Sequence, residues 1–117
     1  MLDQACIFCK IINKSIPSKI VKENDFVLVI EDIAPKAPIH YLVLPKKHMI
    51  HLGHLQPSDT SFCVEIFKMV KELSDTLTSP AAFNLISNNG AAAGQSVAHC
   101  HFHFLAGRNL YDGGLKL

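Results

Sequence analysis

Three histidines stand at alternate positions near the C-terminus, in the run His99-Cys100-His101-Phe102-His103-Phe104. Successive side chains of a β-strand point to opposite faces, so a strand over 97–105 would place all three imidazoles on one face. Imidazole titrates near neutral pH, attacks phosphorus and carbonyl centres, and binds metals. A hydrophobic core needs no such row, so the spacing predicts a reaction centre.

A loop of small residues precedes this predicted strand. Gly90 and Gly94 bracket three alanines, and Gln95 and Ser96 follow. Small side chains let backbone N–H groups approach a ligand, and successive N–H groups form a nest that binds anions. Most glycine-containing loops are ordinary turns. Directly before three face-sharing histidines, however, this loop predicts a phosphate site.

An imidazole nucleophile beside a phosphate nest indicates phosphoryl or nucleotidyl transfer. His101, the central histidine, would attack the α-phosphorus and form a phosphoramidate, which water or another acceptor would then resolve. His103 on the same face would hold the phosphate or the leaving group. The hydroxyl of Ser96 and the amide of Gln95 would donate hydrogen bonds to phosphate oxygens or to the leaving atom.

Composition limits the classes of protein to which the chain can belong. A length of 117 residues with 49% hydrophobic and 18% charged residues predicts one globular domain over 1–117. A formal net charge of +1 gives no strong positive electrostatic field that would bind nucleic acid or a membrane surface. No apolar run approaches the ~20 residues that cross a bilayer, and the N-terminus lacks the pattern of a signal peptide. We therefore expect a cytoplasmic protein with no nucleic-acid or membrane partner.

Hydrophobic periodicity predicts the elements that must position these groups. Apolar residues recur at steps of three and four over 57–77, as in an amphipathic helix. Short apolar or β-branched runs predict strands. The expected order is a short helix over 6–12, strands over 19–23, 26–30 and 39–44, the long helix over 57–77, and strands over 83–87 and 97–105. This order predicts an α+β fold with a mostly antiparallel five-stranded sheet.

The histidine run matches the His-φ-His-φ-His-φ-φ motif of the histidine triad (HIT) superfamily, where φ is an apolar residue. Further segments are similar to its Hint branch and occur in the same order: 16–21, 32–40, 44–48 and Asn88-x-Gly90-x-x-x-Gly94-Gln95-Ser96. The resemblance implies a HIT-like fold and a homodimeric purine nucleotide hydrolase without an organic cofactor. Hint-like proteins cleave nucleoside phosphoramidates, such as adenosine monophosphate joined to an amine.

The resemblance also implies roles for individual residues. His101 takes the place of the nucleophile, Asp32 that of the carboxylate that holds the ribose hydroxyls, and His40 that of an inner histidine that supports the triad. Taken alone, Asp32 would be a turn residue, and the apolar residues of the expected purine slot would be ordinary core. The phosphate and leaving-group contacts would be Asn88, Gly94, Gln95, Ser96 and His103, and the apolar slot around the purine Ile7, Phe8, Ile11, Ile30 and Ile33.

A Cys-x-x-Cys pair, Cys6 and Cys9, supplies two of the four ligands that a structural zinc ion needs. Resemblance to many bacterial HIT proteins and to galactose-1-phosphate uridylyltransferases implies that His48 and His99 complete the site. The zinc would then tie the N-terminal helix to the histidine run. A zinc-free pair of small residues is the alternative, because eukaryotic-type Hint proteins lack the metal.

Two other classes of function stay open at this point. One is a nucleotide-binding or interaction protein with little turnover, although every nominal catalytic position is filled. The other is a metal module rich in histidine and cysteine. The chain also departs from the Hint pattern: it has no tryptophan, and Ala106-Gly107-Arg108 replaces Gly-Gly-Arg after the triad. The wide apolar face of the predicted helix, which includes Cys63 and Phe67, agrees with a homodimer.

Overall fold

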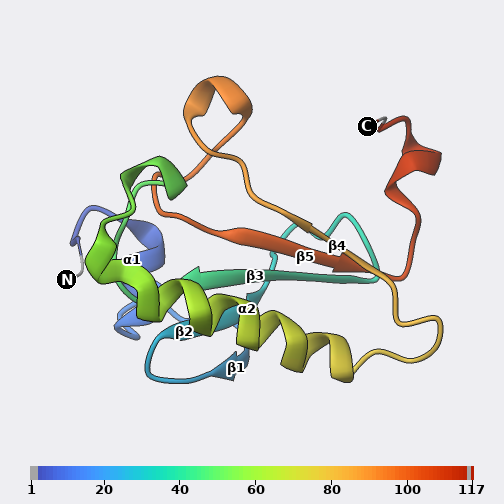
Figure 1. The fold of residues 1–117 in the computed structure, drawn as a ribbon, viewed down its shortest axis with the longest axis horizontal. Helices are drawn as coiled ribbons and strands as arrows, with labels where there is room; N and C mark the ends of the chain where they lie inside the picture. Colours follow the sequence, from blue (N-terminus) through green and yellow to red (C-terminus); the bar gives the residue numbers. More distant parts are fainter. Residues whose placement is uncertain (1–2, 116) are drawn as a thin grey trace.

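The structure, a computed structural model, describes residues 3–115 and 117 (Figure 1). Its α-helices are α1 (Ile7–Ile12) and α2 (Thr60–Asp75). Its strands are β1 (Ile20–Glu23), β2 (Val27–Glu31), β3 (Ile39–Pro45), β4 (Phe83–Ile86) and β5 (Phe102–Ala106). Short 3₁₀ helices cover Leu52–His54, Pro57–Asp59, Ala91–Ala93 and Leu110–Gly113. None of the helices in the described part of the chain is long and apolar enough to cross a membrane.

All strands form one sheet in the order β1-β2-β3-β5-β4. Every neighbouring pair is antiparallel, and β5 lies between β3 and β4. In the register of β3 with β5, His40 lies opposite Leu105 and Leu42 opposite His103. The predicted α+β class, with its five-stranded antiparallel sheet, one long helix and one short N-terminal helix, is therefore confirmed.

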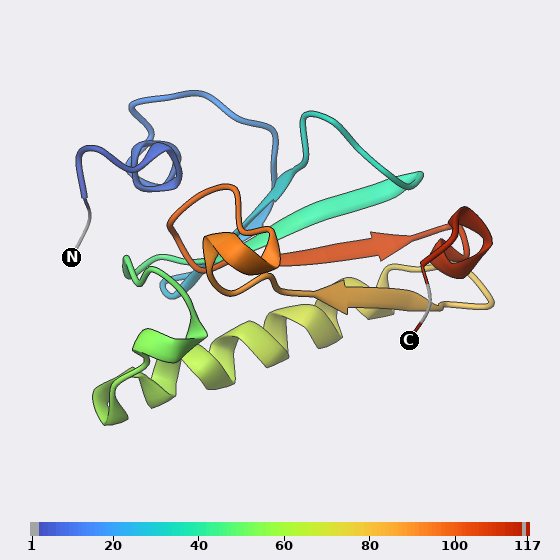
Figure 2. The same ribbon diagram turned by 90° about the horizontal axis from the view of Figure 1, so that it is seen from above.

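Side-chain alternation divides the core into two layers, one on each face of the sheet. Val29 and Val43 point toward α2, whereas Leu28 and Leu44 point toward α1, and all four are fully buried. Figure 2 shows the sheet between the two helices, with α2 along one face and α1 on the other. Both faces of the central strands are covered, which explains the uninterrupted apolar runs at residues 27–30 and 42–44.

The long helix buries one stripe of side chains at helical spacing: Ile66, Met69, Val70 and Leu73. Each such side chain contributes about 1.5–3 kcal/mol when it leaves water, so this stripe fixes α2 on the sheet. The helix is shorter than the predicted 57–77, because Pro57–Asp59 forms a 3₁₀ turn before it and Thr76 ends it. In that turn the buried carboxylate of Asp59 accepts hydrogen bonds from Lys47 and from the backbone of Gln56.

The strand predicted over 97–105 begins only at Phe102, and this prediction was wrong in its first half. The segment before it leaves the sheet: the backbone N–H of Cys100 donates to the carbonyl of Met49, at 2.7 Å, in the loop after β3. His99 and His101 therefore do not belong to a strand, and only His103 does. The three imidazoles consequently do not form one even row.

Candidate active site and metal centre

His101 is buried and directly precedes β5 in the chain, and a main-chain hydrogen bond fixes its ring. Its Nδ1 lies 2.7 Å from the carbonyl oxygen of His99. A carbonyl can only accept, so Nδ1 carries the hydrogen and donates it. A neutral imidazole has one N–H and one lone pair, which leaves the lone pair on Nε2. This is the arrangement that a nitrogen nucleophile needs.

The tautomers of His40 and His103 follow from the same reasoning. The backbone N–H of Lys36 donates to Nδ1 of His40 at 3.0 Å, so the ring hydrogen of a neutral His40 must be on Nε2. That Nε2 lies 2.9 Å from Nδ1 of His103 and donates to it. The hydrogen of His103 is then on its own Nε2. His103 thus offers an N–H group, whereas His101 offers a lone pair.

Burial keeps these two histidines neutral. Burial lowers the pKa of His103 from 6.5 to about 4, with further lowering by His101, His40 and Lys36 and an opposing effect of Asp32. The pKa of His40 is also lowered, mainly by burial, again against Asp32. A proton on Nδ1 of His103 would in addition meet the N–H of His40. At neutral pH both rings are therefore uncharged hydrogen-bonding groups.

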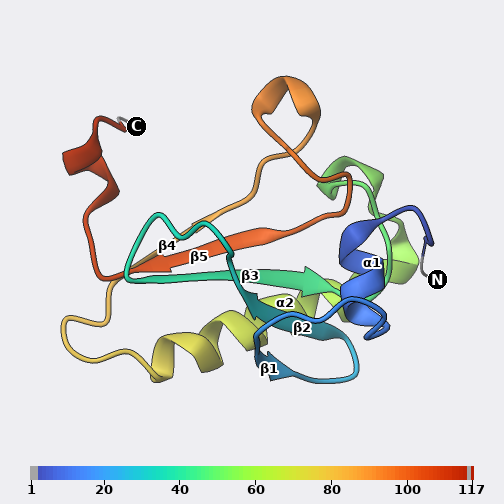
Figure 3. The same cartoon turned by 180° about the vertical axis from the view of Figure 1, so that it is seen from behind.

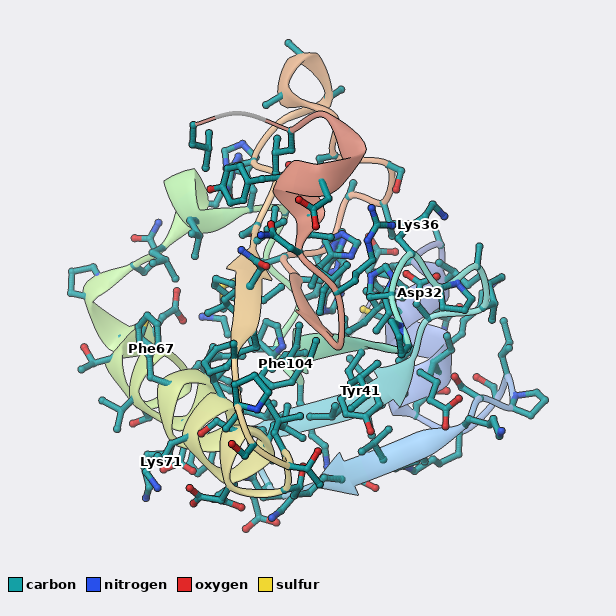
Figure 4. The ribbon with its side chains drawn as sticks, turned by 90° about the vertical axis from the view of Figure 1, so that its right-hand side faces the viewer. Asp32, Lys36, Tyr41, Phe67, Lys71 and Phe104 are labelled. Carbon is teal, nitrogen blue, oxygen red and sulfur yellow. The ribbon has the colours of Figure 1, made fainter. Side chains whose placement is uncertain are left out.

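Asp32 stands beside His40 on the loop after β2. One carboxylate oxygen lies 3.4 Å from Nε2 of His40, and the other accepts from the backbone N–H of Ala34 at 2.8 Å. The side chain of Asp32 retains 17% exposure, so it can still reach a ligand. Figure 4 shows Asp32 and Lys36 together on this loop, on the side of the sheet away from Phe67 and Lys71 of α2.

The small-residue loop is a tight turn, and the backbone N–H groups of Gly90, Ala93, Gly94 and Gln95 donate hydrogen bonds within it. Gly90 and Gly94 have φ angles of 97° and 94°, in the region that favours glycine, on either side of the Ala91–Ala93 turn. Figure 1 shows this turn projecting from the sheet. Ser96, which follows the turn, is exposed, and Asn88 before it is half-buried. Ser96 and Asn88 can therefore reach a ligand, whereas the bonded N–H groups of the loop would first have to exchange their partners.

Gln95 differs from its expected role as a phosphate donor. Its side-chain oxygen accepts from the N–H of Gly90 at 2.7 Å, and its side-chain nitrogen donates to the carbonyls of Ile50 at 2.6 Å and Val97 at 2.9 Å. The amide therefore braces the loop from within. A contact with phosphate would require one of these hydrogen bonds to be exchanged.

The five residues expected around a purine fall into two groups. Phe8, Ile11 and Ile30 are buried in the core cluster beneath α1. Ile33 is completely exposed and Ile7 is 48% exposed, so these two present free apolar surface. Phe8 also meets the rings of His101 and His99 edge-on, with centroid distances of 5.2 and 5.9 Å. Phe8 thus packs directly against the ring of His101.

Four ligand atoms converge where α1, the segment after β3 and the histidine run meet: Sγ of Cys6 and Cys9, and Nδ1 of His48 and His99, all within 4.8 Å of one another. The distances between these atoms are 3.3 and 3.5 Å for sulfur–nitrogen pairs and 3.2 Å for the nitrogen pair. A tetrahedral zinc ion with bonds of about 2.3 Å to sulfur and 2.0 Å to nitrogen would give edges of about 3.5 and 3.3 Å. The arrangement therefore fits a closed tetrahedral site.

The tautomer of His99 supports this fit. Its Nε2 donates to the carbonyl of Pro45 at 2.9 Å, so the lone pair is on Nδ1 and faces the two sulfurs. Burial lowers the pKa of His99 to about 4, so the ring is neutral, as a ligand must be. Burial raises the pKa of the Cys9 thiol to about 11, and a cation among these atoms would reverse that shift.

A second cluster of Asp32, His40 and His103 also lies within 4.8 Å but differs in its chemistry. There an N–H of His40 points at the lone pair of His103, and the gap between the rings is filled by a hydrogen bond. Two metal ligands would need both lone pairs free. This second group is therefore a hydrogen-bonded array, whereas the cysteine-containing cluster has the chemistry of a metal-ligand set.

Sequence reasoning missed the groups that set these tautomers. They are main-chain atoms: the carbonyls of His99 and Pro45 and the N–H of Lys36. No side-chain pattern reports them, because any residue type supplies the same N–H and C=O. Their positions depend on the departure of 97–101 from the sheet and on the loop between β2 and β3.

Comparison with known proteins agrees with this geometry. The model of the HIT domain family matches residues 13–110. An uncharacterized HIT-like protein of Synechocystis is 41% identical over 102 residues, which cover 87% of this chain and 90% of that protein. A HIT family hydrolase from Clostridium thermocellum has a TM-score of 0.88 at 36% identity and covers 98% of both chains. A histidine triad protein from Clostridium difficile has a TM-score of 0.87 at 38% identity, covering 93% of this chain and 96% of that one. The chain belongs to the HIT family.

Proposed function

We propose that this protein is a Hint-like nucleotide hydrolase that cleaves purine nucleoside phosphoramidates through a covalent nucleotidyl-histidine intermediate. The observation that carries the proposal is the tautomer of His101: the carbonyl of His99 holds the hydrogen on Nδ1 and leaves Nε2 free to attack. Membership of a family that includes a HIT family hydrolase of the same fold supports hydrolysis as the reaction. The catalytic set is His101, His103, His99, Ser96 and His40.

The proposed reaction has two steps. In the first, the lone pair on Nε2 of His101 forms a bond to the α-phosphorus, and the phosphorus–nitrogen bond of the substrate breaks. The amine leaves with that electron pair and takes up one proton from solvent, which the exposed Ser96 hydroxyl relays. In the second step water attacks the phosphorus, loses a proton, and releases the nucleoside monophosphate from His101.

The remaining groups stabilise charge and hold the nucleotide. The N–H that His103 carries on Nε2 donates to a phosphoryl oxygen as negative charge develops there. Asp32 accepts from the ribose hydroxyls. Ile7 and Ile33 provide exposed apolar surface for the base.

A structural zinc ion would be held by Cys6, Cys9, His48 and His99. Bound there, it supplies a cross-link rather than a Lewis acid, because four protein ligands leave no open position. The cross-link would join α1, which carries Phe8, to the carbonyl of His99 that orients His101. The chain's own residues perform the chemistry.

We further propose that one domain spans 1–117 and that two copies associate through α2. Phe67 and Val64 on the outer face of α2 are 63% and 51% exposed. Beside them lies an apolar groove of about 270 Å³ whose lining includes Phe62, Cys63 and Phe102. Exposed apolar surface of this kind is what a twofold partner covers. A cytoplasmic location stays a prediction of the sequence.

The experiment that tests the proposal is turnover of adenosine 5′-phosphoramidates by the wild-type chain and by His101→Asn. Asparagine is close in size and polarity but has no nucleophilic ring nitrogen. We expect kcat/KM to fall by more than about 1,000-fold while the circular dichroism spectrum and nucleotide affinity persist. Lys19→Ala, at a side chain with 81% exposure, is the control. Equal activity in His101→Asn would overturn the mechanism, and nucleotide binding without turnover in the wild type would identify a binding protein.

A further inference from the structure

Two contacts join the tail after β5 to the loop between β2 and β3. Nη1 of Arg108 donates to the carbonyl of Lys36 at 3.0 Å. Gly107 has a φ of 95°, and a Cβ there would lie 3.0 Å from Cβ of Pro38, so its backbone packs directly on that proline. Figure 3 shows the tail and the loop meeting at the same end of the sheet.

The tail leaves space for the Arg108 side chain. A Cβ on Gly113 would lie only 2.6 Å from Nη2 of Arg108, so a side chain at position 113 would push the guanidinium away. The Leu110–Gly113 turn thus leaves room for the guanidinium beside the loop. Neither the hydrolytic steps nor the metal site uses this arrangement.

The residue that Arg108 holds is also the residue that sets the tautomer of His40. The carbonyl of Lys36 accepts from Arg108, and the N–H of Lys36 donates to Nδ1 of His40 at 3.0 Å. His40 in turn donates to His103 at 2.9 Å. A hydrogen-bonded path therefore runs from the exposed tail to the ring of His103.

We propose that Arg108 is a positioning residue for the triad: by anchoring the Lys36 backbone it keeps the hydrogen of His40 on Nε2 and the hydrogen of His103 on Nε2. The inference rests on the proposed function for its catalytic consequence, but the tautomers can be tested without turnover. The charged or titratable groups facing the two rings are Asp32 and Lys36 on the loop and His101 on the segment before β5.

The test is the ¹⁵N chemical shifts of the imidazole nitrogens, which separate N–H from lone-pair nitrogen, measured on the full chain at neutral pH. In the wild type we expect N–H at Nε2 and a lone pair at Nδ1 for both His40 and His103. In Arg108→Ala, the Nδ1 and Nε2 shifts of each of these two histidines should move toward each other, as expected for a mixture of both tautomers. Gly113→Ala should act likewise by displacing the guanidinium, and Arg108→Lys should restore the wild-type pattern, because its ammonium can reach the same carbonyl.

Activity provides the second readout. Loss of one such hydrogen bond should lower kcat/KM for an adenosine 5′-phosphoramidate by about 5-fold, with recovery in Arg108→Lys and no change in Lys19→Ala. Wild-type ¹⁵N shifts in both Arg108→Ala and Gly113→Ala would overturn the proposal, whatever the activity. Altered shifts with unchanged kcat/KM would overturn the catalytic consequence. An inactive wild type would refute the proposed function instead, and the ¹⁵N shifts would still decide the role of Arg108.

Discussion

Substitution of Cys9 by serine tests the metal centre most sharply. The side chain of Cys9 is 1% exposed, and its sulfur lies 3.3 Å from Nδ1 of His48 and 3.5 Å from Nδ1 of His99. Serine keeps the volume nearly unchanged but does not form the strong bond to zinc that a thiolate forms. The loss would therefore fall on metal affinity rather than on packing.

The magnitude follows from what the metal holds in place. Helix α1 has only six residues and cannot be stable alone. Its docking depends on Phe8, Ile11 and Ile12, each worth about 1.5–3 kcal/mol by burial, and on the proposed zinc ion. At a free zinc concentration about 1,000 times Kd, bound metal adds about 4 kcal/mol to the stability. For a domain of this size that corresponds to a fall in Tm of about 12–24 °C without it.

The assay combines elemental analysis with thermal unfolding, with and without a chelator. We expect about one zinc per wild-type chain and a chelator-dependent Tm, and neither in Cys9→Ser. Cys63→Ser is the matched control, since Cys63 lies on α2 outside the cluster. The reasoning is refuted if purified wild type holds no metal and its Tm ignores both zinc and chelator.

Three further outcomes follow from the described residues. Burial lowers the pKa of His103 from 6.5 to about 4, so between these pH values the unfolded chain binds more protons than the folded chain. The free energy of unfolding, measured in urea, should therefore fall as the pH drops from 6.5 to 4. This fall should be less steep in His103→Asn. Ile33→Ser, at a fully exposed side chain, should leave Tm unchanged and raise KM about 5-fold at constant kcat; an unchanged KM would remove Ile33 from the base slot. Gln95→Ala deletes the hydrogen bonds that brace the loop and should cost about 1–3 kcal/mol of unfolding free energy; a cost near zero would show that the loop does not depend on them.

The fold was predictable because its periodicities are strong. Alternation and apolar runs reveal the strands, and the spacing of Ile66, Met69, Val70 and Leu73 reveals α2. The error lay at 97–101, where alternation of His99 and His101 mimics a strand. There the backbone N–H of Cys100 donates to the carbonyl of Met49 in a loop instead of to a neighbouring strand. The local sequence pattern does not predict this long-range contact.

The side chains that make up the candidate site were predictable from the sequence, but the tautomers of its histidines were not. The Cys-x-x-Cys spacing predicts two of the four candidate ligands, the family resemblance implies the other two, and the structure places all four ligand atoms together. Which nitrogen of each ring carries hydrogen depends on the carbonyls of His99 and Pro45 and on the N–H of Lys36. The bracing role of Gln95 was likewise invisible, because its amide offers the same donors to phosphate as to backbone carbonyls.

Direct detection of the covalent intermediate tests the central claim. The wild-type chain would be mixed rapidly with an adenosine 5′-phosphoramidate, quenched under conditions that preserve phosphorus–nitrogen bonds, digested, and analysed by mass spectrometry. The account predicts an adenylyl group on His101 in the wild type and none in His101→Asn. An adenylyl group on another residue, or turnover with no adenylylated peptide in either protein, would contradict it.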